Sequence, residues 1–297
     1  MGTRVIVEKV NAFTDSLDGG NPAGVVLNSP LDLSDEQMIF ITRSLEVSET
    51  AFVFSTHDEK FFRVRFFTPE IEVDLCGHAT IATFFTMASK GFFPTDKKLF
   101  DVNQETKAGL LPVTVEFGDN GTVNRVMMTQ RKPVFRDIYL DISKIADSLN
   151  IKTDEINVSL PLQRVSTGLF TLPVCVESFD VLRGMKPDFE KIKKICNEID
   201  VGSFHVFTFD TLEQNSLYHA RNFAPVYGVN EDPVTGTANG AVCSYLVKNK
   251  IIKKGKFNCE QGDIINRKGR VMVEIDENNM VKVGGRARIV LEKEIML

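Results

Sequence analysis

Hydrophobic and polar positions along the chain predict the same order of elements twice. In the first half, Ser34 and Gln37 form a capping box for a helix, because apolar residues then recur at helical spacing. Alternating apolar and polar residues at 51–54 and 62–67 predict two strands after this helix.

The second half repeats this order. Asp188 can cap a helix with apolar residues at helical spacing, and the segments 205–209 and 216–223 alternate as strands do. Each half continues with a glycine-containing turn, a helix and a hairpin. We expect the hairpin turns at 119–121 and 277–279, where Asp, Asn, Glu and Gly residues gather.

Three short segments of the first half recur at nearly one offset, between 156 and 159 residues later. The pairs are RFFTP at 65–69 with RNFAP at 221–225, CGHATIA at 76–82 with TGTANGA at 235–241, and VEFGDN at 115–120 with VEIDEN at 273–278. Three matches at nearly one offset indicate a duplicated unit.

The helices predicted after the two glycine motifs are unusual because they have no charged face. Neither 78–89 nor 237–247 contains Asp, Glu, Lys or Arg, whereas a helix on a protein surface normally carries a polar side. We therefore expect each helix to be wrapped by the strands of its own half. This pattern predicts an α+β protein whose two pseudo-symmetric domains each curve a mostly antiparallel sheet around a central helix.

The expected domains are 1–130 and 131–284, with the boundary in the Pro- and charge-bearing stretch 131–137. The last strand, at about 285–297, could return to the first half. We expect the active site in the cleft between the two halves.

Composition narrows the function. The 297 residues carry 35 Lys and Arg against 40 Asp and Glu, a net charge of −5, which argues against nucleic acid as a partner. The longest uncharged stretch around the Phe-rich segment, 75–89, is too short to cross a bilayer, so no membrane partner is expected. Five widely spaced cysteines without a CxxC pair, and without clustering with the histidines, favour free thiols, a cytoplasmic protein and no metal site.

Signatures of P-loop, dinucleotide-binding, zinc-protease and serine-hydrolase sites are absent from the sequence. What remains is a pair of predicted helix N-termini, at Gly77-His78 and Gly236-Thr237. Free N–H groups and the positive end of the helix dipole make such N-termini anion sites. A small carboxylated metabolite is therefore the expected ligand.

Two carboxylates lie near these helix N-termini along the chain. Glu49 stands where a polar turn enters an apolar strand, and burial there would suit a general base that later returns the proton as an acid. The alternative is that Glu49 caps the turn. Asp232 precedes Pro233 in the loop before the second N-terminus, where a structural Asx turn is the alternative.

Three further side chains have two interpretations each. His78 at a helix start would tend to be neutral and suits a hydrogen-bond donor or proton relay, or else it has a capping or packing role. Thr237 is expected as an N-cap before it is a ligand-binding hydroxyl. Cys76 is expected to be a small buried residue and not a nucleophile, because no base is visible beside it.

Together these motifs resemble those of the phenazine biosynthesis PhzF-like family. The motifs are GNPAGV at 20–25, SETAFV at 48–53, FTP at 67–69, CGHAT at 76–80, EDPVTGTA at 231–238 and EQG at 260–262, which cover nearly the whole chain. The resemblance implies the diaminopimelate epimerase-like fold and cofactor-independent isomerisation. It also implies that Glu49 is the general acid/base, that His78 and Asp232 assist, and that Gly77, Gly236 and Thr237 line the substrate pocket.

The resemblance further makes a homodimer the expected assembly. One departure is that the family often has Ser where Thr237 stands, which adds a methyl group to the pocket. Another is that Thr235 occupies the position that matches Cys76, so a two-thiol epimerase is not expected. Two alternatives to hydrogen-shift isomerisation stay open, namely amino-acid epimerisation or racemisation and a non-catalytic binding protein of the same fold.

Overall fold

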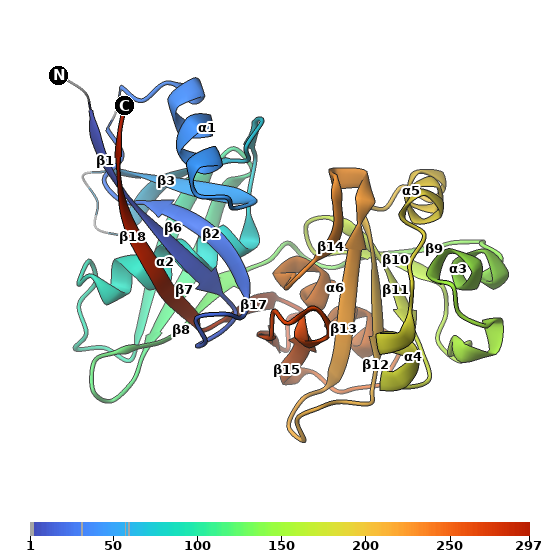
Figure 1. The fold of residues 1–297 in the computed structure, drawn as a ribbon. Helices are drawn as coiled ribbons and strands as arrows, with labels where there is room; N and C mark the ends of the chain where they lie inside the picture. The colour runs from blue at the N-terminus through green and yellow to red at the C-terminus, as the bar shows by residue number, and fades with distance from the viewer. Residues whose placement is uncertain (1–2, 31, 57, 59) are drawn as a thin grey trace. The chain divides into compact units, whose positions relative to one another are not determined.

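The computed structural model describes residues 3–30, 32–56, 58 and 60–297. The chain divides into two compact units (Figure 1). Unit 1 comprises 1–129 and 284–297, and unit 2 comprises 130–283.

Unit 1 is a strand-rich body with two helices in its described part. Its helices are α1 (Asp35–Ser44) and α2 (Gly77–Ser89). Its strands are β1 (Arg4–Ala12), β2 (Asn21–Val26), β3 (Glu49–Ser55), β4 (Phe61–Phe67), β5 (Glu72–Val73), β6 (Leu99–Thr106), β7 (Gly109–Phe117), β8 (Val123–Thr129) and β18 (Ala287–Met296). β2 and β3 run parallel, as do β4 and β6, whereas β18–β1, β1–β2, β3–β4, β4–β5, β6–β7 and β7–β8 are antiparallel.

Unit 2 has more helices around a similar set of strands. Its strands are β9 (Val134–Asp137), β10 (Gln163–Ser166), β11 (Phe170–Cys175), β12 (Ser203–Thr208), β13 (Tyr218–Ala224), β14 (Val229–Asp232), β15 (Gly255–Gln261), β16 (Gly269–Ile275) and β17 (Val281–Gly285), whose last two residues already belong to unit 1. Its helices are α3 (Ile142–Leu149), α4 (Phe179–Gly184), α5 (Phe189–Glu198) and α6 (Gly236–Lys248), with short 3₁₀ turns η1 (Thr153–Glu155), η2 (Pro225–Tyr227) and η3 (Asp263–Ile265).

Strand pairing shows the internal repeat directly. β11 and β12 are parallel, as are β13 and β15, and the pairs β9–β10, β10–β11, β12–β13, β13–β14 and β15–β16 are antiparallel. This is the order of parallel and antiparallel pairs seen in unit 1. The predicted fold class, two like halves with mostly antiparallel strands, is therefore confirmed.

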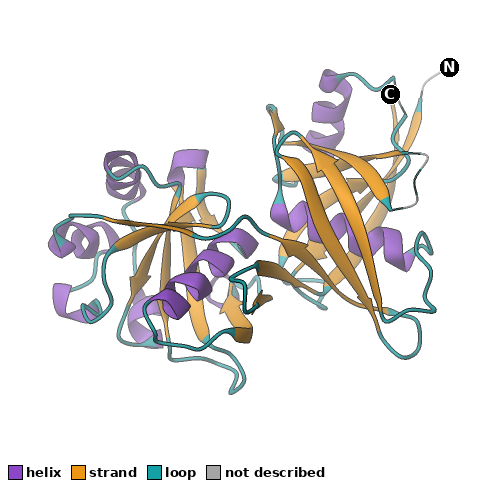
Figure 2. Cartoon of the chain, turned by 180° about the vertical axis from the view of Figure 1, so that it is seen from behind, coloured by secondary structure: helices purple, strands orange, loops and turns teal. Residues whose placement is uncertain are grey.

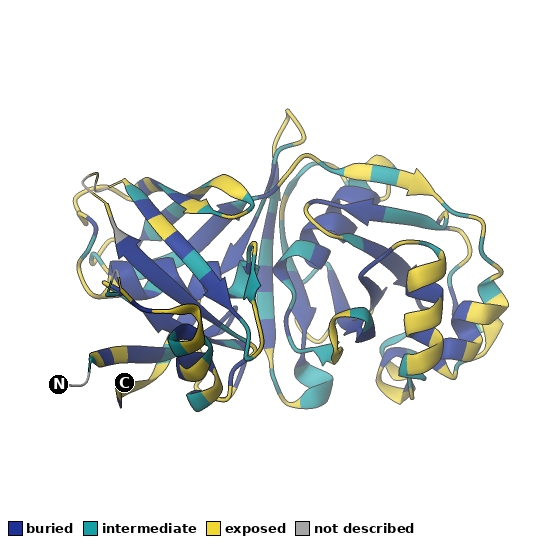
Figure 3. Ribbon diagram, turned by 90° about the horizontal axis from the view of Figure 1, so that it is seen from above, coloured by how far each residue is buried: buried dark blue, intermediate teal, exposed yellow. Residues whose placement is uncertain are grey.

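The two uncharged helices are the central helices of their units, as predicted. α2 contacts β1, β2, β3, β7, β8 and β18, and α6 contacts β10, β11, β12 and β16. Figure 2 shows α2 crossing behind the strands of unit 1, and Figure 3 shows buried residues concentrated along strands and central helices. Small residues permit this packing, since a Cβ at Gly240 would stand 2.7 Å from Val283 Cγ1. No helix of the described ranges is long and apolar enough to span a membrane.

Local capping signals account for the outer helices. The capping box of Ser34 and Gln37 is present at α1, and the Asp188 side chain accepts a hydrogen bond from the backbone N–H of Lys191 at α5. The short helices α3 and α4 were not predicted, although Asp141 and Ser178 cap them in the same way.

One arginine–glutamate pair is duplicated between the units. Arg65 donates to both carboxylate oxygens of Glu72 at 2.8 Å, and Arg221 donates to those of Glu231 at 2.9 and 2.8 Å. The hydrogen bonds from Arg65 lower the pKa of Glu72 to about 2. Each pair joins the two strands that lead to the N-terminus of a central helix, so it holds the approach to that N-terminus in place.

Buried His205 makes the stability of unit 2 depend on pH. Burial lowers its pKa to about 4 from the ordinary histidine value of 6.5, so the folded chain keeps it neutral while the unfolded chain protonates it as pH falls. Its stabilising contribution is therefore complete above pH 6.5 and is lost as pH falls toward 4.

We expect the free energy of unfolding to fall by about 3 kcal/mol over this range because of His205. His205→Phe should flatten that part of the stability curve, which urea unfolding at a series of pH values would measure. An unchanged slope in the variant would assign the acid sensitivity to other groups.

Candidate active site

Glu49 is the first residue of β3, beside a glycine that lets two strands approach closely. β3 runs parallel to β2, with Gly24 paired to Thr50. A Cβ at Gly24 would lie 2.4 Å from Thr50 Oγ1 and 2.7 Å from Leu45 Cδ1, so only glycine fits without displacement. The Glu49 side chain is 23% exposed, which leaves its carboxylate within reach of a small molecule.

His78, in the first turn of α2, faces this carboxylate. Its Nε2 lies 3.4 Å from Glu49 Oε2 and 3.4 Å from Ser48 Oγ, and the side chain is 11% exposed. The distance to Glu49 is too long for a strong hydrogen bond. Oε2 of Glu49 is buried and has no hydrogen-bond partner among the described residues, so it can accept a proton from a ligand.

Cys76 has a base beside it, contrary to the expectation from sequence. The sequence showed no base beside this cysteine, but its Sγ lies 3.4 Å from Nδ1 of the His78 ring. The two residues are on one turn of chain, where the N-cap position of Cys76 lets its side chain fold back over the helix start. Cys76 is buried, as expected. Its thiol therefore has a basic group within contact distance, which favours proton exchange between them.

The same three residues form a set of possible metal ligands. Donor atoms of Glu49, Cys76 and His78 all lie within 4.8 Å of one another. Carboxylate, thiolate and imidazole are ligands that zinc accepts. The expectation that cysteines and histidines do not cluster is therefore wrong at this position, and the cluster offers both acid/base and metal-binding chemistry.

Backbone N–H groups at the start of each central helix provide anion-binding donors. Cys76 and Thr235 are the N-cap residues of α2 and α6, and neither makes a side-chain capping hydrogen bond. The first-turn N–H groups, including those of Gly77 and Gly236, have no intrahelical acceptor. Each unit thus carries the helix N-terminus that the sequence predicted.

The cap of α6 differs from the expected one. Thr235 is the N-cap, and Thr237, which the sequence placed there, is in the first turn of α6. The backbone oxygen of Thr237 accepts a hydrogen bond from Thr167 Oγ1 at 3.2 Å. Asp232 is half-buried at the end of β14, and one of its carboxylate oxygens accepts a short hydrogen bond from Thr235 Oγ1. The Thr235 hydroxyl thus binds Asp232 in place of the helix.

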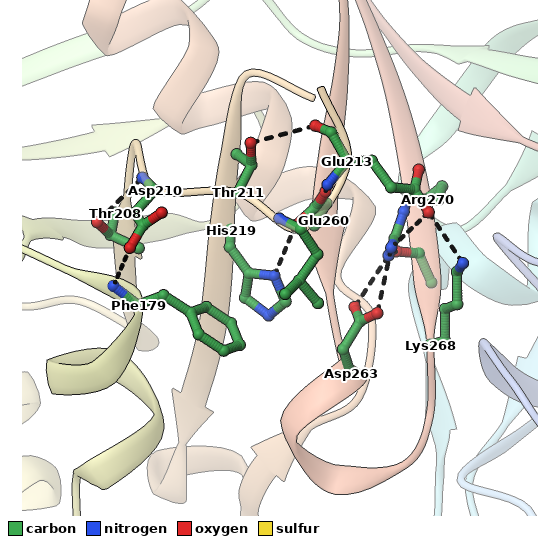
Figure 4. Close-up of polar contacts among 12 residues, drawn as sticks. Phe179, Thr208, Asp210, Thr211, Glu213, His219, Glu260, Asp263, Lys268 and Arg270 are labelled. Atoms are coloured by element: carbon green, nitrogen blue, oxygen red, sulfur yellow. Dashed lines mark hydrogen bonds and ion pairs between the residues drawn. The ribbon is translucent and has the colours of Figure 1, made fainter. Parts of the chain in front are cut away.

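Glu260 belongs to a buried polar cluster that the candidate site residues do not include (Figure 4). Its carboxylate accepts hydrogen bonds from His219 Nδ1 at 2.8 Å and from the backbone N–H groups of Leu212 and Glu213 at 2.9 and 2.7 Å. Burial raises its pKa, but these hydrogen bonds outweigh burial and hold the pKa below its ordinary value. Glu260 therefore fixes the loop between β12 and β13.

Gln261 is a polar residue of the EQG motif at 260–262, and the sequence alone predicted no role for it. Its side chain is buried at the end of β15 and makes hydrogen bonds to Asp232, Thr235 and Asn239. A sequence signal for this role would be a polar glutamine among strand residues whose other side chains are expected to pack against an uncharged helix.

Comparison with known proteins agrees with this fold and these motifs. The family model described as phenazine biosynthesis-like protein, PhzC-PhzF, matches residues 10–293. An uncharacterized isomerase of Clostridium acetobutylicum is 36% identical over 97% of this chain and 97% of its own length. An uncharacterized isomerase of Bacillus subtilis is 35% identical over 95% of this chain and 93% of its own.

Solved structures give the same picture. The crystal structure of a Bacillus anthracis phenazine biosynthesis protein of the PhzF family is similar with a TM-score of 0.89 and 34% identity, covering 99% of this chain and 100% of that one. A hydroxyproline epimerase from Agrobacterium vitis shares the fold, with a TM-score of 0.63 at 13% identity over 99% and 93% of the two chains. The chain belongs to the PhzC-PhzF family of phenazine biosynthesis-like proteins, and these Clostridium and Bacillus subtilis relatives are named isomerases.

Proposed function

We propose that the protein is a cofactor-independent isomerase that moves a proton within a small carboxylate-bearing metabolite. The observation that carries this proposal is the buried carboxylate oxygen of Glu49, which has no hydrogen-bond partner among the described residues and lies 3.4 Å from His78 Nε2 at the start of α2. A carboxylate, an imidazole and the first-turn N–H groups of a helix lie within one unit, which supports roles as base, proton relay and anion site.

The reaction follows from these groups. Glu49 takes a proton from carbon, and the C–H electron pair moves into an enolate-like anion on the carboxylate side of the molecule. N–H groups at the start of α2 stabilise this charge. In a substrate whose carbon–carbon double bond is conjugated with the anion, the charge extends to a second carbon, and protonated Glu49 returns the proton there as the double bond moves. General acid/base catalysis contributes roughly 10²–10⁴ in rate and each oxyanion donor roughly 10²–10³, which suffices for a moderately acidic carbon acid.

The proposal also assigns roles to three residues of unit 2. Asp232 assists proton transfer, and Gly236 and Thr237 bind the substrate. The motif that carries them, EDPVTGTA at 231–238, supports this assignment through its resemblance to the family, and the N-terminal position of Gly236 and Thr237 in α6 supports anion binding.

Epimerisation or racemisation of an amino acid is the second candidate. It requires a second proton carrier, and the contact between Cys76 Sγ and His78 Nδ1 favours one. In this reaction the starting carbon is inverted, whereas one base that delivers and collects on one face moves a hydrogen without inversion.

Exchange of carbon-bound hydrogen in deuterated water tests the proposal. Suitable probes are L-proline, D-proline, trans-4-hydroxy-L-proline and methylitaconate, together with a library of other small carboxylates, and mass spectrometry follows the exchange. We expect at least one probe to exchange with wild type and to lose this exchange with Glu49→Gln. Absence of exchange over the whole library would favour the binding-protein alternative.

Metal removal separates the two chemistries that Glu49, Cys76 and His78 can support. Because the proposed reaction uses only protein groups, we expect dialysis against EDTA to leave the exchange rate unchanged within about twofold. The measurement compares dialysed and untreated enzyme, with added Zn²⁺ as a third sample. Loss of exchange on dialysis and its recovery with Zn²⁺ would instead make this cluster a catalytic metal site.

A further inference from the structure

Gln261 spans the loop that carries Asp232 and the first turn of α6. Its Nε2 donates to the backbone oxygen of Asp232 at 2.9 Å and to Thr235 Oγ1 at 3.2 Å. Its Oε1 accepts from the backbone N–H of Thr235 at 3.1 Å and from Asn239 Nδ2 at 2.9 Å. Gln261 itself is buried, with 1% of the residue exposed, and its hydrogen bonds are buried or partly buried.

Backbone groups determine the orientation of this amide. The N–H of Thr235 can only donate and the carbonyl of Asp232 can only accept, so Oε1 must face the former and Nε2 the latter. A flipped amide would place Nε2 against two donors, the N–H of Thr235 and Asn239 Nδ2, and Oε1 against the carbonyl oxygen of Asp232. The orientation of Gln261 is therefore a consequence of the fold and not a free choice.

The fixed amide gives direction to the Thr235 hydroxyl. A hydroxyl has one hydrogen, and its oxygen accepts from Gln261 Nε2, so its own hydrogen is free to point at the Asp232 carboxylate. The same direction of hydrogen bonding holds at Asn239, which lies deeper in unit 2. Its Oδ1 accepts a hydrogen bond from the Tyr218 hydroxyl at 2.8 Å. Burial raises the pKa of Tyr218, which keeps this hydroxyl protonated and able to donate.

These bonds form one directed chain in unit 2. Tyr218 donates to Asn239, Asn239 to Gln261, Gln261 to Thr235, and Thr235 to Asp232. A glycine completes the arrangement at its strand end. Gly262 has a φ of +90°, and a Cβ there would lie 2.7 Å from the backbone oxygen of Pro233. Glycine therefore lets the backbone after β15 pack closely against the loop that contains Pro233.

We propose that Gln261 and Thr235 are positioning residues that hold Asp232 as an oriented carboxylate through this chain. The inference rests on the proposed role of Asp232 in proton transfer. Hydrogen bonding to the charged form of a carboxyl favours that form, so the hydrogen bond from Thr235 favours ionised Asp232 and holds its carboxylate in one orientation.

Titration of the Asp232 carboxyl by ¹³C NMR tests this inference without a substrate. In Thr235→Val and Gln261→Leu, we expect the titration midpoint of Asp232 to rise by about one pH unit, because a hydrogen bond to a charged group is lost or misdirected. Thr235→Ser keeps the hydroxyl and should restore the wild-type midpoint.

Gln104→Leu is the matched control. Gln104 is equally buried and bonds to Thr80 of α2, in the other unit. It should lose stability without moving the Asp232 midpoint. An Asp232 midpoint that stays in place in both Thr235→Val and Gln261→Leu, or that moves as far in Gln104→Leu, would overturn the inference.

Exchange kinetics on the probes named above separate this inference from the proposed function. If Asp232→Asn leaves the exchange rate intact while the NMR midpoints move as expected, the catalytic role of Asp232 fails and the positioning chain stands. If Asp232→Asn slows exchange but Thr235→Val and Gln261→Leu keep the wild-type rate and pH profile, the positioning role is refuted and the proposed function stands.

Discussion

Glu49→Gln should lower the rate of carbon-bound hydrogen exchange by about 10²–10⁴, the usual contribution of a positioned general base. Glutamine keeps the size of the side chain but cannot take up the proton. Because Glu49 is partly exposed and its buried oxygen makes no hydrogen bond among the described residues, the substitution removes no described hydrogen bond at that atom. The loss of exchange should therefore occur with little change in stability.

The matched control for this substitution is Glu46→Gln, the same chemical change at an exposed position three residues earlier. It should keep the wild-type exchange rate. Mass spectrometry of deuterium uptake gives the rates, and urea unfolding shows whether both variants fold as wild type does. Equal exchange in Glu49→Gln and wild type would remove Glu49 from the reaction.

Arg221→Met should cost about 3–5 kcal/mol in the free energy of unfolding, because breaking a buried ion pair leaves its partner uncompensated. The side chains of Arg221 and Glu231 are 9% and 16% exposed. Arg221 Nη1 also donates to the backbone oxygens of Leu182 and Met185, at 3.1 and 3.4 Å, so its removal also leaves two buried carbonyl groups without this donor.

The internal repeat supplies the comparison. Arg65→Met breaks the equivalent pair in unit 1, but Glu72 keeps an ion pair with Lys107 Nζ at 2.6 Å, and Arg65 is more exposed, at 21%. We expect the loss in Arg65→Met to be clearly smaller than in Arg221→Met. Urea unfolding of both variants measures the difference, and a loss in Arg221→Met no larger than in Arg65→Met would contradict this account of the pair.

Much of the fold could be predicted from sequence because its signals are local. The capping residues Ser34 and Asp188 lie beside the helices they begin, and the missing charges at 78–89 and 237–247 are visible without any knowledge of tertiary contacts. The repeat offset then links the two halves. The short helices α3 and α4 span eight and six residues, too few for a strong periodic signal.

The site was only partly predictable because its remaining features depend on side-chain direction. Sequence places Cys76 and His78 two positions apart, but only the helix start shows that the thiol folds back onto the ring. Thr235, and not Thr237, is the N-cap because it is the last residue with an extended backbone before α6; both are threonines, so residue type could not decide between them. Gln261 reaches a loop 29 residues earlier in the chain, a contact that no local pattern contains.

The stereochemistry of exchange tests the central claim most directly. Each probe that exchanges is incubated with wild type in deuterated water, and NMR locates the deuterium and the configuration of the product. Transfer by Glu49 on one face predicts that hydrogen or deuterium appears at a new carbon and that the original carbon is not inverted. In Glu49→Gln, neither hydrogen nor deuterium should appear at the new carbon. Inversion of the original carbon, with solvent deuterium in both stereoisomers, would contradict the account and identify an epimerase.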